Sequence, residues 1–467
     1  MNVKKLFIDY FKSKGHTEYP SSSLIPNNDK SLLFVNSGMV QFKDIFLGNL
    51  KPKHKTIVSC QKCMRAGGKH NDLDNIGFTT RHHSFFEMLG NFSFGDYFKE
   101  EAIHYAWDFL TNDLKLDSKK LYVSVHESDD VSKDIWLNNI KVDPDKVLVL
   151  GDEDNFWQMG DTGPCGPCTE IYYDLGSKYD GVLPTEGDPK DRYIEIWNLV
   201  FTQYNKTSSG NLEELPQKCV DTGMGLERVQ SIVEGLSDNY DSSIFLDLNN
   251  FIDSKLNLKV KEKYVKKILL DHIRACCHLI GDNVIPDREG RGYVLRRILR
   301  RSSRFIYKHN IKEPFLYQCA EVVCEKSKDF PSLKKDIIKI VDTIKTEETK
   351  YLKTLGKGID IIESHLKKHK SLDAEMIFTL YDTYGFPYEI TEEIASEKNI
   401  TLDKKGYDDL MLEQKNKARK GKSFSDKSIS NLTTSHTTEF LGYNKNNHEG
   451  ILIDLYLDNK KVTKASN

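Results

Sequence analysis

The chain has 467 residues, a length that predicts about three domains at roughly 150 residues each. Its 67 Lys and Arg residues nearly balance its 70 Asp and Glu residues, and the net charge of −3 excludes a polybasic protein and an acidic tail protein while allowing a local basic surface. A hydrophobic content of 38% excludes a disordered chain, and the longest run without Asp, Glu, Lys or Arg, residues 31–42, is too short for a transmembrane helix, which needs about 18 residues.

The first half of the chain predicts an α+β domain. Val3, Phe7, Tyr10 and Phe11 share one face at helical spacing, which predicts an amphipathic first helix and argues against a secretory or transit peptide. Short apolar runs between turn signals predict strands at 32–35, 121–125 and 147–150. Runs of strands with few helices favour an antiparallel sheet flanked by helices.

The second half has a different texture. From about residue 237 the chain is rich in Lys, Ile and Leu with helical periodicity, for example at 347–355, which predicts a mostly helical domain. Residues 420–438 are polar and weakly patterned, which is typical of a linker. The apolar run at 450–457 followed by Asp458 and Asn459 predicts the start of a hairpin and thus of a third domain.

Residues 58–98 contain the highest concentration of candidate ligand-binding side chains. They predict a strand, a polar loop and a second strand, and cations crowd the loop: Arg65, Lys69, His70, Arg81, His82 and His83. Phe85 and Phe86 follow at once. Cations hold phosphates and a ring stacks on a base, so this pattern is typical of a nucleotide site. On composition alone, a solvated hairpin loop is an equally good interpretation.

Two later stretches add polar anchors to rigid turns. Residues 221–229 predict a strand that turns tightly into a helix, with Asp221 suited to an ammonium group and Arg228 to a base or phosphate. Trp157 lies among Gly and Pro, and Glu170 and Asn198 offer further hydrogen-bonding groups. Ordinary turns and core structure are the alternative interpretation of both stretches.

The helix expected at 291–304 concentrates arginine. Five guanidinium groups fall within about 140° of one helix face without interleaved acids; they belong to Arg296, Arg297, Arg300, Arg301 and Arg304. This pattern predicts a surface for RNA phosphates. A solvated charged face is the alternative, although such faces normally mix both signs of charge.

Taken together, these motifs resemble the alanyl-tRNA synthetase family of class II aminoacyl-tRNA synthetases, specifically its N-terminal catalytic and tRNA-recognition part. The resemblance runs through residues 37–43, 65–98, 221–229, 291–297 and 380–387, and so covers nearly the whole chain. It implies an α+β fold with a six- to seven-stranded antiparallel sheet. The implied domains are a catalytic domain at 1–236, a helical acceptor-stem recognition domain at 237–435, and at 436–467 a linker with the start of a β-barrel or editing region.

The resemblance also implies a set of site residues. The implied catalytic residues are Arg65, Asp221 and Arg228. The implied ATP-binding residues are Arg65, Lys69, Arg81, His82, Phe85, Phe86, Met88, Gly225 and Arg228, with the adenine between Arg228 and either Phe86 or Phe85. The implied alanine-binding residues are Met39, Trp157, Asn198, Asp221 and Gly223. The implied tRNA-binding residues are Arg291, Arg296, Arg297, Arg300, Arg301 and Asp382.

The implied reaction is ATP-dependent formation of alanyl-adenylate, followed by transfer to the 3′ end of tRNA(Ala). ATP, Mg²⁺, L-alanine and tRNA(Ala) are the implied cofactors and partners, with no membrane partner, a cytoplasmic location and a monomeric state. The family reads a G·U pair in the acceptor stem, for which we expect Asp382 and Arg301, because Gly290 replaces a base-contacting Asn of some relatives. Its editing domain, which binds zinc, would lie beyond residue 467, so we expect no zinc here and no correction of activated serine or glycine.

Nine cysteines at irregular spacing fit free thiols in a reducing compartment. The pairs Cys60 with Cys63 and Cys165 with Cys168 suggest a zinc site, but the gap between the pairs is far longer than usual. His365 and His369 have helical ligand spacing, but lysines flank them, which favours a surface helix. The alternative functions are therefore a non-catalytic, zinc-stabilised RNA-binding protein and a synthetase-like paralogue with another substrate.

Overall fold

A computed structural model describes residues 1–27, 32–67, 71–256, 258–259, 262–386, 388–421, 455–457 and 460–462. The chain forms two compact units, Met1–Lys353 and Thr354–Asn467. The division lies inside a long helix and differs from the expected boundary at residue 236, because the helices that follow this residue bury their apolar faces in one core with Met64 and Phe85 of the sheet region.

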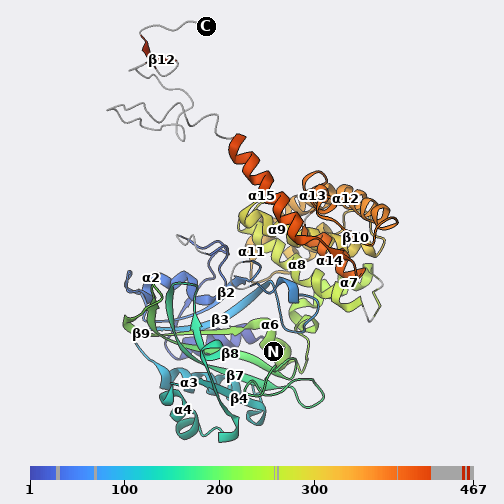
Figure 1. The fold of residues 1–467 in the computed structure, drawn as a ribbon. Helices are drawn as coiled ribbons and strands as arrows, with labels where there is room; N and C mark the ends of the chain where they lie inside the picture. Colours follow the sequence, from blue (N-terminus) through green and yellow to red (C-terminus); the bar gives the residue numbers. More distant parts are fainter. Residues whose placement is uncertain are drawn as a thin grey trace. The chain divides into compact units, whose positions relative to one another are not determined.

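The first unit is built around a nine-stranded sheet (Figure 1). In spatial order its strands are β1 (Thr17–Tyr19), β2 (Thr56–Met64), β3 (Phe85–Phe94), β9 (Leu212–Gly225), β8 (Tyr193–Lys206), β7 (Gly163–Asp174), β4 (Leu121–His126) and β5 (Val147–Leu150), with β6 (Phe156–Gln158) paired to β7. In this spatial order, each neighbouring pair between β2 and β4, which includes β3, β9, β8 and β7, is antiparallel. The outer pairs β1–β2 and β4–β5 are parallel. The antiparallel α+β prediction is thus confirmed.

Helices cover this sheet and extend the unit. They are α1 (Val3–Ser13), α2 (Lys43–Phe46), α3 (Lys99–Asp108), α4 (Asp130–Asp134), α5 (Asp152–Asn155), α6 (Leu226–Val233), α7 (Leu246–Lys255), α8 (Lys263–Gly281), α9 (Gly290–Lys308), α10 (Leu316–Lys326), α11 (Pro331–Lys335) and the first part of α12 (Ile337–Leu366). Figure 1 shows α8 and α9 side by side, and the apolar residues of both belong to one buried cluster.

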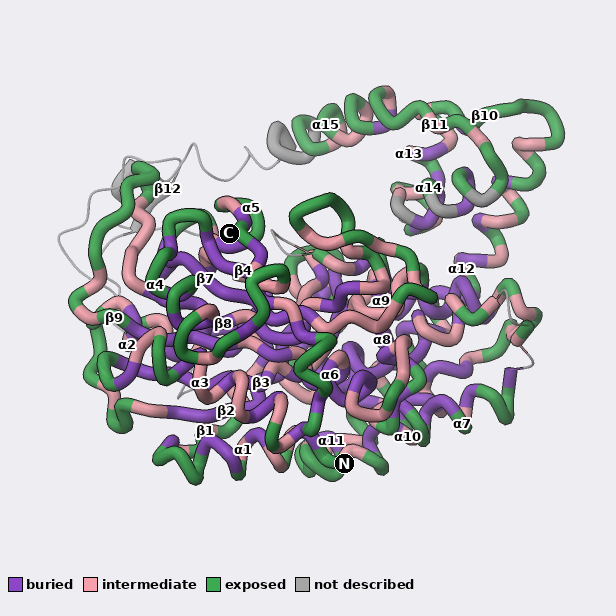
Figure 2. Tube along the Cα trace, turned by 90° about the horizontal axis from the view of Figure 1, so that it is seen from below, coloured by how far each residue is buried: buried purple, intermediate pink, exposed green. Residues whose placement is uncertain are grey.

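Helix α1 confirms the predicted amphipathic start. The Asn2 side chain caps it by accepting from Lys5 N at 3.0 Å. Phe7 and Phe11 lie on the buried face, with ring centres 5.6 and 6.3 Å from Trp197 of β8. Strands β2, β3 and β7 are buried along most of their length, whereas exposed segments gather in the connecting loops (Figure 2). Aromatic packing on α1 therefore anchors the strand that carries Asn198.

The predicted strands have mixed outcomes. Residues 121–125 and 147–150 form β4 and β5 as expected. Residues 32–35 do not form a strand, because their backbone makes only isolated bonds, such as Val35 N to Leu24 O at 2.9 Å and Met64 N to Val35 O at 2.8 Å. Burial of Phe34 and Val35 explains the apolar run without a ladder.

The second unit contains the rest of α12 with α13 (Ala374–Asp382), α14 (Tyr388–Glu397) and α15 (Lys404–Gly421). Strands β10 (Ser371–Leu372) and β11 (Thr401–Leu402) pair in parallel, and β12 (Leu455–Leu457) and β13 (Lys460–Val462) form the predicted antiparallel hairpin. The predicted linker at 420–438 falls, after Gly421, outside the described residues. None of the described helices is both long and apolar enough to cross a membrane.

Candidate active site

The middle of the sheet forms the floor of a cavity of about 660 Å³, a volume typical of ligand pockets. Register explains why distant residues meet there. Asn198 pairs with Gly223, and Met88 pairs with Gly225. Since side chains alternate along a strand, every second residue of β3, β8 and β9 faces the same side. Most of the sequence-predicted nucleotide and alanine residues line this one cavity: Arg65, Arg81, His82, Phe86, Met88, Trp157, Asn198, Asp221, Gly223, Gly225 and Arg228.

Arg65 lies where β2 ends, and its backbone is held on both sides. Its N–H donates to Ser84 O at 2.8 Å, and its carbonyl accepts from Asp72 N at 3.1 Å. Its guanidinium donates through Nε to Asn36 O at 3.2 Å and lies 5.2 Å from the centre of the Phe86 ring. The remaining N–H groups of a guanidinium suit a carboxylate or a phosphate in the cavity.

The structure separates the two phenylalanines that the sequence left as alternatives. Phe86 lines the cavity, whereas Phe85 is fully buried on the opposite face of β3. The Phe85 ring stacks on His278 with centres 4.1 Å apart and receives the Arg274 guanidinium at 5.2 Å. Phe85 is thus a core residue, so the expectation that it binds ATP is corrected, and Phe86 is the aromatic ring available to a base.

Asp221 is a buried acid on the cavity side of β9. It is 5% exposed, and it makes no hydrogen bond or ion pair through its carboxylate with any other described residue. Burial raises the pKa of Asp221 to about 7, because the charged form is poorly solvated there. A substrate ammonium would supply the missing counter-charge.

Close packing beside Asp221 limits the room for a substrate. A Cβ atom at Gly223 would come within 3.0 Å of Met88 Sδ, so this side of the cavity has little space for further atoms. Trp157 lies on β6, which pairs with β7 through Gly166. The cavity near Asp221 therefore suits a small side chain.

Asn198 is oriented by a neighbouring acid on β7. Its Nδ2 donates to Glu170 Oε1 at 2.7 Å, and the Tyr172 hydroxyl donates to the other oxygen of Glu170. The amide oxygen of Asn198 is left without a hydrogen-bond partner among the described residues. Glu170 and Tyr172 thereby turn the acceptor end of Asn198 away from β7.

Cations at the other end of the cavity are held by acids and carbonyls. Arg228, in the first turn of α6, donates to the backbone oxygen of Glu195 and to its carboxylate at 3.3 Å. Arg81 donates to Lys190 O and to Asp191 Oδ1 at 3.1 Å. Both guanidinium groups keep further N–H donors for phosphate oxygens.

His82 is uncharged, although the sequence predicts a cation at this position. Burial, aided by the nearby positive charges of Arg228, Arg81 and Arg65, lowers the pKa of His82 to about 4. Its neighbour His83 is also buried, and burial lowers the pKa of His83 to about 3. These histidines were expected to be cations of the loop; at neutral pH they are uncharged and can only donate or accept hydrogen bonds.

Two other expected ligands are not among the described residues that line the cavity. Lys69 and its neighbour His70 lie outside the described residues, so the ATP role of Lys69 stays a prediction. Met39 is fully buried in a cluster with Phe42 and Phe92 and does not line the cavity, so its direct contact with alanine is corrected to a packing position.

Helix α9 overturns the predicted arginine surface. Arg300, Arg301 and Arg304 are only 9%, 5% and 1% exposed. Arg300 pairs with Glu347 of α12 at 2.9 Å, and Arg301 donates to His272 Nε2 of α8 at 3.1 Å. The acid that holds Arg300 and the acceptors that hold Arg301 come from outside α9, so the absence of acids within α9 itself was misleading.

The outer arginines of α9 remain partly accessible. Arg291 donates to Leu33 O, Arg296 pairs with Glu347 at 3.2 Å, and Arg297 lies 3.7 Å from Asp74. In the second unit, Asp382 is exposed at the end of α13 and accepts from Gln414 Nε2 of α15. These four residues retain side-chain surface that an RNA backbone or base could reach.

The cysteine pairs are poorly arranged for zinc. Cys60 pairs with Leu89 and Cys63 with Phe86 across β2 and β3, so the two thiols face opposite sides of the sheet. All nine cysteines are free and buried, and burial raises the pKa of Cys63. Among the described residues, no three His, Cys, Asp or Glu side chains gather as metal ligands. His365 and His369 stack with ring centres 4.3 Å apart.

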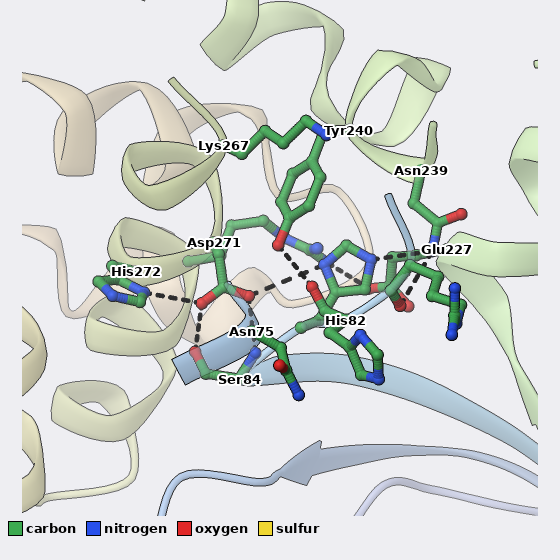
Figure 3. A network of polar contacts seen from close by, with 12 residues as sticks. Asn75, His82, Ser84, Glu227, Asn239, Tyr240, Lys267, Asp271 and His272 are labelled. Atoms are coloured by element: carbon green, nitrogen blue, oxygen red, sulfur yellow. Dashed lines mark hydrogen bonds and ion pairs between the residues drawn. The ribbon is translucent and has the colours of Figure 1, made fainter. Parts of the chain in front are cut away.

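Sequence reasoning missed the buried residues behind the cavity. Asp271 of α8 contacts Ser84 and its neighbour His272 (Figure 3). His272 in turn accepts from Arg301 of α9. A usable signal did exist, because the otherwise apolar stretch 268–280 is interrupted by Asp271, His272, Arg274 and His278. Buried ionisable groups in such a stretch are normally paired.

Comparisons with known proteins agree with these observations. The family model described as "tRNA synthetases class II (A)" matches residues 2–467. Alanine–tRNA ligase of Vesicomyosocius okutanii is 46% identical over 99% of this chain and 54% of that protein. Those of Rickettsia akari and a Psychrobacter species are 46% and 47% identical over 98% and 99% of this chain. The chain therefore spans about half the length of the curated relatives that it matches.

Proposed function

Because the chain belongs to the class II (A) family of tRNA synthetases, we propose that it activates L-alanine with ATP and transfers the alanyl group to the 3′ end of tRNA(Ala). One observation carries the proposal: a cationic guanidinium, Arg65, and a buried carboxylate, Asp221, line a single small cavity. These groups match the carboxylate and the ammonium of an amino acid. The names of the relatives supply alanine as the specific amino acid.

The chemistry needs positioning rather than a covalent catalyst. The alanine carboxylate attacks the α-phosphate of ATP, the bond to the β-phosphate breaks, and pyrophosphate leaves. Arg65 stabilises the charge on the phosphoryl oxygens and Asp221 holds the ammonium group, so the reacting oxygen and phosphorus are brought into line. Phe86 and Arg228 offer an aromatic face and a planar cation for the adenine, since both line the cavity.

Mg²⁺ fits this donor set as an ion held mainly by phosphate oxygens. The cavity wall contains the carboxylates of Asp152, Asp154 and Glu195, which are hard oxygen ligands. A bound Mg²⁺ ion would neutralise part of the triphosphate charge. The chain's own contribution is to keep Arg65 and Arg81 on the remaining oxygens.

Amino-acid-dependent exchange of pyrophosphate into ATP tests the proposal. We expect exchange with L-alanine, weaker exchange with serine and glycine, and none with L-leucine, because Met88 already fills the room beside Gly223. Serine and glycine should react because one methylene or hydroxyl changes binding by only about 1–3 kcal/mol. Exchange that does not depend on alanine, or that is faster with leucine, would refute the assignment.

The pH dependence of alanine binding offers a second test. With a pKa of about 7, Asp221 is half ionised at pH 7 and about one-tenth ionised at pH 6. Only the carboxylate pairs with the ammonium group, so the KM for alanine should rise about fivefold from pH 7 to pH 6 and level off above pH 8. The KM for ATP, measured in the same buffers, is the control. An alanine KM that is constant down to pH 6 would contradict this role.

We propose tRNA(Ala) as the partner, with Arg291, Arg296, Arg297 and Asp382 as its contacts. Their support is partial or full exposure, together with the resemblance; Arg300 and Arg301 are withdrawn because they are buried. Asp382→Ala should lower the preference for a G·U over a G·C acceptor pair in aminoacylation, and an unchanged preference would remove Asp382 from the set.

Nine free cysteines support the cytoplasm as the compartment. The monomeric state and the lack of zinc stay predictions.

A further inference from the structure

We propose that Asp271 of α8, together with His272 and Arg301, is a set of positioning residues for Arg65. These three residues would fix the catalytic guanidinium from behind the cavity during the tRNA-independent step. This inference rests on the proposed adenylation function. It also gives Arg301 a role that differs from the tRNA contact implied by its sequence motif.

Asp271 fastens the chain segment just before β3. It is fully buried, and its carboxylate accepts from Ser84 N at 2.8 Å, from the Ser84 hydroxyl and from His272 Nδ1 at 2.8 Å (Figure 3). His83 brings its Nδ1 to 3.7 Å from the same carboxylate. These contacts lower the pKa of Asp271 against the effect of burial, so the acid remains an acceptor at neutral pH.

Ser84 links Asp271 to the backbone of Arg65. While its N–H and hydroxyl bind Asp271, its carbonyl accepts from Arg65 N at 2.8 Å. One residue thus joins the buried carboxylate of α8 to the backbone of Arg65. A change in the position of Ser84 would displace Arg65 relative to Asn36, which accepts from its Nε at 3.2 Å.

His272 extends the network to α9 with a defined tautomer. Burial lowers the pKa of His272, so the ring is neutral and carries one proton. Asp271 only accepts and Arg301 only donates, so the proton is on Nδ1 and the free Nε2 accepts from Arg301 Nη1 at 3.1 Å. Arg301 also donates to Ile76 O at 3.3 Å, in the loop that connects β2 and β3. The same loop is therefore held from both α8 and α9.

Unlike an ordinary buried ion pair, this network holds a loop of the candidate active site. The hydrogen bonds named above end on residues 76–84 or on a neighbour that contacts them, and these residues belong to the loop between Arg65 and Phe86. Tyr240, for example, donates to His82 O at 2.7 Å. A loss of this network should therefore displace the phosphate end of the cavity and leave the Asp221 end, on β9, in place.

The test measures pyrophosphate exchange without tRNA for Asp271→Asn, Ser84→Ala and Arg301→Met. We expect Asp271→Asn to lower the kcat of exchange about 10²-fold, as for a displaced catalytic group, and Ser84→Ala about tenfold, as for one lost hydrogen bond. Arg301→Met should lower the kcat although no tRNA is present. The KM for alanine should rise by a smaller factor than the kcat falls in all three variants, because the ammonium site at Asp221 on β9 stays in place.

Asp253→Asn is the matched control, because Asp253 also pairs with α8, through Lys266 at 2.9 Å, but at an exposed position. If folded Asp271→Asn keeps the wild-type kcat, the proposal is wrong. It is equally wrong if activity falls only in proportion to the unfolded fraction seen in thermal melts. Should Asp271→Asn fail to fold, Ser84→Ala decides: an unchanged kcat in that variant refutes the proposal. Absence of exchange in the wild-type chain would instead refute the proposed function.

Discussion

Replacing Arg65 with alanine should lower the rate of alanyl-adenylate formation roughly 10²–10³-fold, the effect expected for the loss of one charge-stabilising donor. The guanidinium lies in the cavity beside Phe86, and among the described residues it donates one hydrogen bond, from Nε to Asn36 O. Its other N–H groups are thus placed for the phosphoryl oxygens. Rapid-quench measurement of adenylate at saturating alanine and ATP gives the rate directly.

The fold should survive this substitution, because the two hydrogen bonds that hold residue 65 are made by its backbone. Arg192→Ala is the matched control: Arg192 pairs with Asp174 at 3.1 Å, and neither residue lines the cavity. Arg65→Lys should recover little activity, because an ammonium group cannot make the planar, two-pronged contact of a guanidinium. Adenylate formation near the wild-type rate in Arg65→Ala would remove Arg65 from the mechanism.

The contrast between Arg65 and Arg301 shows what sequence patterns can predict. Arg65 and Asp221 lie in local motifs, at a strand end and before a strand-to-helix turn, and the structure brings both to one cavity. Arg301 also lies in a clear local pattern, yet it is buried against His272. Helical periodicity groups side chains on a face, but it does not show what covers that face. The covering residues here are 29 positions or more away.

Other errors have the same origin. The charge of His82 depends on burial and on Arg228, which is far away in sequence. The choice between Phe85 and Phe86 needed the face of β3 that meets the cavity, and this face follows from pairing with β9, not from the motif itself. The apolar run at 32–35 has the composition of a strand but finds no ladder partner. In each case, contacts with residues distant in sequence determine the structure, and the local pattern does not show them.

Asp221→Asn should raise the KM for alanine about 10–100-fold, as expected for the loss of a buried, charged hydrogen bond, and should leave the KM for ATP nearly unchanged. Asparagine keeps the shape of the side chain and removes the charge that the substrate ammonium needs. The rise in alanine KM between pH 7 and pH 6 should also disappear, because no group that titrates near pH 7 remains at this position. Asp174→Asn, outside the cavity, is the control. An unchanged alanine KM would show that another group holds the ammonium.

The Asp221→Asn variant should be at least as stable as the wild-type chain, because the pKa of Asp221 is raised in the folded state. In the folded chain the pKa of Asp221 is raised to about 7, whereas in an unfolded chain it is near 4. The unfolded state therefore loses its proton first, and ionisation of Asp221 lowers the free energy of unfolding as pH rises from about 4 to 7. Thermal melts should show Asp221→Asn at or above the wild-type Tm at pH 8, with the difference shrinking toward pH 5. Weaker alanine binding together with a higher Tm is the signature of a carboxylate kept buried for its ligand, and a purely structural Asp221 would give the opposite change in stability.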